Sequence, residues 1–251
     1  MEEERFAAAL DAAEYDMGCK GIGTLHEKTL HIALKHFFAP DPSCHERQIG
    51  GMIADAVTED GVIEIQTRNL SRLREKLRVF LSICPVTVVH PIANPKWLLT
   101  VDENGVLLSK RKSPKHETIF TAIREIYTLR EFIGDTRFRL CICEMELAEY
   151  RYRANNQKRY TEKLDRVPLK LKQIQYFTSP ADYLSLLPAH RSEPFTAKEI
   201  AALANVNPSD MRMLLSILER LGAAEQTGKR GRAVLWQTAE LFRTVSDSTG
   251  G

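Results

Sequence analysis

The sequence predicts an α/β (α+β) protein of two parts, and three observations predict it. Apolar residues change repeatedly between helical and strand spacing before residue 150, which indicates a mixed sheet flanked by helices. Two strand-like segments, 53–57 and 62–66, are joined by a tight turn. Two short helical patterns and two short strands follow residue 195. We therefore divide the chain into an acidic N-terminal segment (1–20), a mixed-sheet domain (21–150), a basic connector (151–177) and a small C-terminal domain (178–245).

Composition places the chain among globular proteins. It has 251 residues, of which 43% are hydrophobic and 27% charged, enough to bury the cores of two domains. It contains no run of ~20 apolar residues, so we expect no membrane span. The N-terminus is acidic and lacks a signal-like segment. The five cysteines are an odd number without disulfide-like spacing, and we expect a cytoplasmic location.

The first predicted elements surround a hairpin. Leu30, Leu34 and Phe37 recur at helical spacing, which predicts a helix over 24–38. Strands Ile53–Val57 and Val62–Gln66 follow, with Asp60-Gly61 as a two-residue turn. Asn69 or Ser71 caps a second helix that runs to about Leu81.

Strand-like segments dominate the next part of the chain. We predict a buried strand over 85–91, a pair of strands over 97–102 and 106–109, a helix over 116–133 and an alternating strand over 137–149. Residues 151–172 carry eight basic and two acidic side chains without regular periodicity. This stretch is interpreted as a mobile linker or a clamp for a polyanion, or as ordinary solvated surface.

The C-terminal helices have clear boundaries. Thr196 and Glu199 have capping-box spacing, and Pro208 stands where a first-turn proline is tolerated. The helix from Ser209 to Leu221 ends at Gly222. Strands 224–227 and 233–237 then flank a basic, glycine-bearing loop.

This order of elements resembles the winged-helix family over roughly residues 178–240. The resemblance implies that the second helix enters the major groove of double-stranded DNA and that the loop, or wing, lies on the backbone. An alternative is a winged helix used for protein contact, because Asp210 is acidic and the helix has few bases. The matching residues are Asn207, Ser209, Asp210 and Arg212 on the helix, and Lys229, Arg230 and Arg232 on the wing.

The predicted hairpin places two acids on one face. A two-residue turn at Asp60-Gly61 sets Val57 opposite Glu64 and Asp55 opposite Gln66, so Asp55, Glu64 and Gln66 share a side. Two close carboxylates repel each other, and a hard divalent cation such as Mg²⁺ or Mn²⁺ relieves the repulsion. The opposite face suits burial because it carries Ala54, Ala56, Ile63 and Ile65.

At these residues the segment resembles the PD-(D/E)XK nuclease superfamily. Asp55 matches the first acid of that motif and Glu64 the second, while Ala54 and Gln66 stand where proline and lysine are usual. The resemblance implies a restriction-endonuclease-like sheet, a metal held by Asp55, Glu64 and the carbonyl of Ile65, and catalytic roles for Glu27 on the preceding helix and for Gln66. Because Gln66 has no positive charge, Arg68, Arg72 or Lys76 is expected to supply one.

These features predict a metal-dependent DNA endonuclease positioned by its winged helix. Arg111 and Lys112 are further candidates for phosphate contact, and a homodimer or larger complex fits cutting of both strands. One alternative is a non-catalytic DNA-binding regulator on a decayed nuclease core; another is an RNA-binding or scaffold protein. His26, His31 and His36 do not form a predicted metal row, because a spacing of five spirals around a helix.

Overall fold

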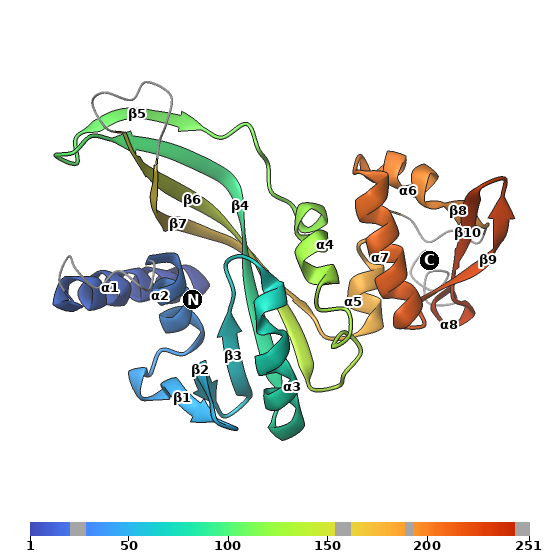
Figure 1. The fold of residues 1–251 in the computed structure, drawn as a ribbon, viewed down its shortest axis with the longest axis horizontal. Helices are drawn as coiled ribbons and strands as arrows, with labels where there is room; N and C mark the ends of the chain where they lie inside the picture. The colour runs from blue at the N-terminus through green and yellow to red at the C-terminus, as the bar shows by residue number, and fades with distance from the viewer. Residues whose placement is uncertain (21–28, 154–161, 189–192, 244–251) are drawn as a thin grey trace.

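The computed structural model describes residues 1–20, 29–153, 162–188 and 193–243. It confirms a mixed α+β architecture with a large mixed sheet flanked by helices (Figure 1). Six strands of the seven-stranded sheet follow the order β1-β2-β3-β4-β6-β7, and β5 pairs with β4. A second sheet of three strands, in the order β8-β10-β9, lies in the C-terminal part. No helix in these ranges is long and apolar enough to cross a membrane.

Two helices cover one face of the large sheet. Helix α1 (Glu2–Lys20) contains the acidic N-terminal segment, and it packs on α2 (Thr29–Phe38). Both contact β7, and α2 also contacts β3. Leu30, Leu34 and Phe37 are buried as their helical spacing predicts. The predicted helix start at 24–28, including Glu27, lies outside the described residues.

The hairpin forms with a register that differs from the prediction. Strands β2 (Met52–Thr58) and β3 (Gly61–Ile65) turn at Glu59-Asp60, so Thr58 pairs with Gly61 and Val57 with Val62. The predicted pairing of Val57 with Glu64 is wrong by two residues. Gly61 begins β3 at a position where an added Cβ would lie 2.2 Å from the Pro85 carbonyl oxygen, so a side chain does not fit there. A shift of two preserves the faces, and Ala54, Ala56, Ile63 and Ile65 are buried as predicted.

The sheet grows on both sides of this hairpin. An additional strand, β1 (His45–Ile49), pairs antiparallel with β2. A 3-10 turn, η2 (Leu70–Leu73), leads into α3 (Arg74–Ile83) within the predicted second helix. Residues Val86–Val101 form one strand, β4, parallel to β3 and β6, where two separate strands are predicted. β5 (Leu107–Lys112) pairs with its distal end.

The prediction of a basic connector over 151–177 is wrong. Residues Glu162–Phe177 form β7, which pairs antiparallel with β6 (Phe138–Tyr152) along most of both strands. β7 mostly lacks the alternation of a half-buried strand, and its basic side chains are exposed except for the half-buried Arg166, so its sequence pattern does not reveal its pairing. Before β6, α4 (Ile119–Tyr127) is shorter than the predicted helix over 116–133.

The C-terminal elements appear where they are predicted. The predicted helices correspond to α6 (Ala197–Ala204) and α7 (Pro208–Arg220), and the predicted strands to β9 (Ala224–Arg230) and β10 (Ala233–Thr238). The structure adds three short elements that were not predicted: α5 (Pro180–Leu184), β8 (Phe195–Thr196) and α8 (Glu240–Arg243). The capping box is confirmed, because the Glu199 carboxylate accepts from the Thr196 N–H at 2.7 Å while Thr196 Oγ1 accepts from the Glu199 N–H at 3.3 Å.

The C-terminal helices pack directly on the large sheet's helices. α7 lies against α4 (Figure 1), and Arg124 Nε on α4 is 2.5 Å from Asp210 Oδ1 on α7. Leu214 and Leu218 of α7 belong to the same hydrophobic cluster as Val88 of β4 and Leu140 of β6. One core therefore runs from the sheet into the C-terminal part.

Candidate active site

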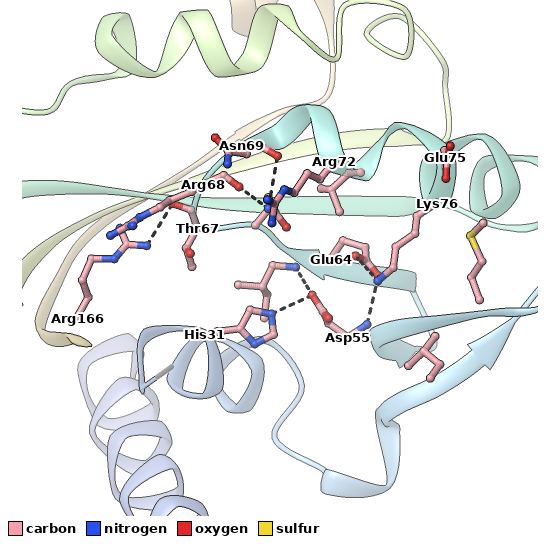
Figure 2. A pocket seen from close by; sticks show the side chains of 15 residues that line it. His31, Asp55, Glu64, Thr67, Arg68, Asn69, Arg72, Glu75, Lys76 and Arg166 are labelled. Carbon is pink, nitrogen blue, oxygen red and sulfur yellow. Dashed lines mark hydrogen bonds and ion pairs between the residues drawn. The ribbon is translucent and has the colours of Figure 1, made fainter. Parts of the chain in front are cut away.

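A pocket of about 1020 Å³ opens beside the hairpin. Its walls come from β2, β3, α2, α3, β7 and the loop that follows β3, residues 66–69 (Figure 2). Asp55 and Glu64 lie together in this pocket, with Lys76 beside Glu64 and His31 beside Asp55. The pocket therefore gathers side chains from sequence positions as distant as 31 and 166.

Asp55 is held by two donors. Its Oδ2 accepts from the Ile65 N–H at 2.7 Å and lies 3.2 Å from His31 Nε2. Burial by itself raises the pKa of this carboxyl. The hydrogen bond and charge of His31, the Ile65 N–H and the charge of Lys76 outweigh burial and lower the pKa below its ordinary value. Asp55 is thus a carboxylate at neutral pH.

The pKa of Glu64 is shifted in the opposite direction. It is only 1% exposed, and Lys76 Nζ lies 3.0 Å from each of its carboxylate oxygens. Burial, followed by the charge of Asp55, raises the pKa of Glu64 to about 7, while Lys76 acts against that rise. Because the charge of Asp55 raises the pKa of Glu64, a cation beside the two carboxylates would relieve their repulsion and favour the ionised form of Glu64.

Most of the residues predicted around this pair line the same pocket. Gln66, however, does not point at the carboxylates: its Nε2 donates to the carbonyls of Arg68 and Asn69. Lys76 contacts Glu64 instead, so it is the cation beside the acids. The predicted residues that line the pocket are Asp55, Glu64, Ile65, Gln66, Arg68, Arg72 and Lys76.

The other predicted nucleic-acid contacts lie elsewhere. Arg111 and Lys112 are exposed on β5. Ser209 Oγ donates to Asn207 Oδ1, and Arg230 forms an ion pair with Glu199 at 2.6 Å. Arg212, Lys229 and Arg232 are exposed in the C-terminal part.

Sequence reasoning missed His31 and Arg166. His31 belongs to a row of three histidines whose five-residue spacing does not predict a metal site. The fold places it against Asp55 as a hydrogen-bonding partner. Arg166 lies in the basic stretch, where no local pattern distinguishes it from its neighbours. A signal for either residue exists only after α2 and β7 are placed on the sheet.

The donor set of the pocket fits a hard divalent cation. Asp55 and Glu64 supply carboxylate oxygens, the ligands that Mg²⁺ and Mn²⁺ prefer, and Mg²⁺ needs only one or two of them with water and substrate phosphate. Among the described residues, no three His, Cys, Asp or Glu side chains gather closely enough to hold a metal. Lys76 already balances one negative charge, so a cation at Glu64 competes with its ammonium group.

Fold and pocket together define an α+β protein with a pair of carboxylates, buried Glu64 and partly exposed Asp55, on neighbouring strands of a hairpin. Residues 28–178 match the family model described as "Domain of unknown function (DUF8091)", and the chain belongs to that family. The matched range contains the seven-stranded sheet and the pocket. The chain is also 31% identical over 221 residues to an "Uncharacterized protein" of Treponema pallidum (strain Nichols), covering 86% of this chain and 87% of the relative. No solved structure matches the chain.

Proposed function

We propose that this protein is a metal-dependent DNA endonuclease that hydrolyses phosphodiester bonds. The observation that carries the proposal is the Asp55–Glu64 pair, with Glu64 buried and Lys76 at its side, in an open pocket. The surrounding elements support a restriction-endonuclease-like core. Helix α2 precedes an antiparallel meander, β1-β2-β3, and α3 then connects β3 to the parallel strand β4.

The residues of the pocket have separate roles in this proposal. Asp55, Glu64 and the Ile65 carbonyl would hold Mg²⁺ or Mn²⁺, which would lower the pKa of the attacking water and neutralise charge on the phosphate. His31 orients Asp55 through the contact at Oδ2. Lys76 favours the ionised form of Glu64, and it would offer its charge to the substrate phosphate if a cation occupied the site at Glu64.

The C-terminal part holds the DNA. Its order of elements supports a winged helix, and the β9–β10 hairpin presents Lys229, Arg230 and Arg232 as the wing. In this arrangement α7 packs on α4 and buries Asp210, so we assign backbone contact chiefly to the wing.

Cleavage assays with matched variants test the proposal. Supercoiled and linear DNA are incubated with Mg²⁺, Mn²⁺ or EDTA and wild type, Asp55→Asn, Glu64→Gln or Lys76→Met. We expect metal-dependent nicking that each substitution reduces by about 100-fold or more while DNA binding persists. Glu59→Gln, in the exposed turn of the same hairpin, is the control and retains activity.

One observation favours a second function. Lys76 meets both oxygens of Glu64 and satisfies the charge that a metal would satisfy, as expected for a decayed core in a DNA-binding regulator. Calorimetric titration with Mn²⁺ separates the two functions. Binding that Asp55→Asn abolishes supports the enzyme, whereas tight DNA binding without metal binding or cutting supports the regulator.

A further inference from the structure

The loop that follows β3, residues 66–69, is fixed by side chains from other elements. His90 Nδ1 on β4 donates to the Gln66 carbonyl at 2.7 Å, and Arg166 Nη2 on β7 donates to the Thr67 carbonyl at 3.3 Å. Gln66 itself donates to the carbonyls of Arg68 and Asn69, and Asn69 adopts a left-handed conformation with φ of 53°. The loop is therefore preorganised beside the carboxylate pocket.

Arg166 is poorly compensated for a half-buried cation. Its Nε is buried and has no hydrogen-bond partner, and within the described ranges its guanidinium forms no ion pair. Burial and then the nearby charge of Arg68 lower the pKa of Arg166, although Glu117 and Glu149 act in the opposite direction. A guanidinium held beside another cation, with an orphaned donor, costs the free protein stability.

Both arginines stand at the boundary between two cavities. The carboxylate pocket and a second cavity of about 450 Å³ share Thr67, Arg68, Asn69 and Arg166. In Figure 2, Arg166 and Arg68 lie across the pocket from Asp55 and Glu64. The second cavity beyond them is lined by three acids, Glu117, Glu125 and Glu149, against two lysines, Lys96 and Lys163, so a phosphate is favoured more at the boundary than further in.

We propose that Arg68 and Arg166 form a phosphate subsite, which binds the phosphate next to the one cleaved on the same nucleic-acid strand. This inference rests on the proposed nuclease function. Guanidinium groups bind phosphate through paired N–H donors, so a phosphate satisfies the free Nε of Arg166 and relieves the repulsion from Arg68. The phosphate is either an internal phosphodiester or a 5′-terminal phosphate, because both present the same oxygens.

Salt-dependent binding in Ca²⁺ tests the subsite without requiring cleavage. Affinities of short single-stranded DNA are measured at several salt concentrations for wild type, Arg166→Gln and Arg68→Gln. Each variant is expected to lower the slope of log K against log salt by about 0.7, the value for one lost phosphate contact. Arg130→Gln removes an exposed arginine that packs on Tyr127, and it keeps the wild-type slope.

Thermal unfolding without nucleic acid separates ligand binding from a structural role. If Arg166 serves a phosphate, Arg166→Gln has the same or a higher Tm than wild type because a strained cation is removed. A structural arginine gives a lower Tm. Arg68 is exposed, so we expect Arg68→Gln to fold like wild type. This variant therefore reports on the subsite even if Arg166→Gln fails to fold.

The outcomes distinguish this inference from the proposed function. If wild type cuts DNA in Mg²⁺ but both variants keep the wild-type salt slope, the subsite is overturned and the nuclease function is not. Lowered slopes in a protein that never cuts support the subsite and overturn the nuclease. No binding of these strands by wild type overturns the subsite, and the cleavage assays then decide the nuclease by themselves. Tighter wild-type binding of 5′-phosphorylated strands, lost in the variants, identifies a terminal phosphate; equal binding identifies an internal one.

Discussion

Glu64 and His90 show how the fold sets the ionisation of single side chains. Glu64 is buried beside Asp55 and depends on Lys76 for its charge. His90 is buried, donates its Nδ1–H to the Gln66 carbonyl, and has a pKa that burial lowers below the ordinary value. His90 contacts the loop 66–69 directly, and Glu64 lies two residues before it in the sequence.

Acid is expected to destabilise the protein through His90. Because its pKa is lower in the folded state than the unfolded value of 6.5, the unfolded chain binds the extra proton. The stabilising contribution is complete above pH 6.5 and is lost as the pH falls through the folded pKa, by at most about 1.4 kcal/mol per pH unit. Denaturant unfolding between pH 5 and 8 measures the effect.

Two variants isolate this histidine from the other titrating groups. His90→Gln is expected to give a shallower decline of the unfolding free energy below pH 6.5 than wild type. His116→Gln, at an exposed histidine, keeps the wild-type decline. Parallel curves for wild type and His90→Gln would contradict the assignment.

The β2–β3 hairpin shows what controls an element's register. Gly61 has φ of +117°, and a Cβ there would lie 2.2 Å from the Pro85 carbonyl oxygen. Close approach to the chain before β4, rather than turn chemistry alone, thus places Gly61 in the strand and moves the turn to Glu59-Asp60.

Gly61→Ala is expected to destabilise the protein by about 3 kcal/mol, because strain at positive φ and a clash with backbone act together. Gly105→Ala is the matched control. Gly105 also has positive φ, at 77°, but its added Cβ meets no atom within 4 Å, so we expect a loss of about 1 kcal/mol. Equal losses in denaturant unfolding would show that the Pro85 contact is unimportant.

The whole molecule is joined by a core that passes from the sheet through α4 to α7. The two parts are therefore expected to unfold together. The two tryptophans report on them separately, since Trp97 lies on β4 and Trp236 on β10. Fluorescence of Trp97→Phe and Trp236→Phe variants should give coincident unfolding transitions. Two separated transitions would indicate independent domains.

A substitution in this core tests the same coupling. Leu214→Ala on α7 removes a fully buried side chain, and we expect a loss of about 2–5 kcal/mol that both tryptophan reporters detect. Leu203→Ala on α6 alters a leucine that is 54% exposed, and its effect should stay within about 0.5 kcal/mol. Destabilisation of the Trp236 signal alone would contradict the shared core.

Local patterns were sufficient for much of this fold. The helical spacing of Leu30 and Leu34, the alternation across the hairpin and the Thr196–Glu199 capping box each depend on neighbouring residues, and each predicted its element. The shared side of Asp55 and Glu64 followed from the two-residue period of a strand and survived the register error.

Contacts between distant segments were decided by the tertiary structure. The pairing of β7 with β6, the placement of His31 and Arg166 at the pocket and the docking of α7 on α4 join residues far apart in the sequence. Such contacts depend on which surfaces pack together in the folded protein, and local periodicity in the sequence does not specify those partners. The acids of the pocket and its candidate cation Lys76 were therefore visible in the sequence, whereas His31, Arg166 and the hydrogen bonds that set the chemistry of the site came from the assembled fold.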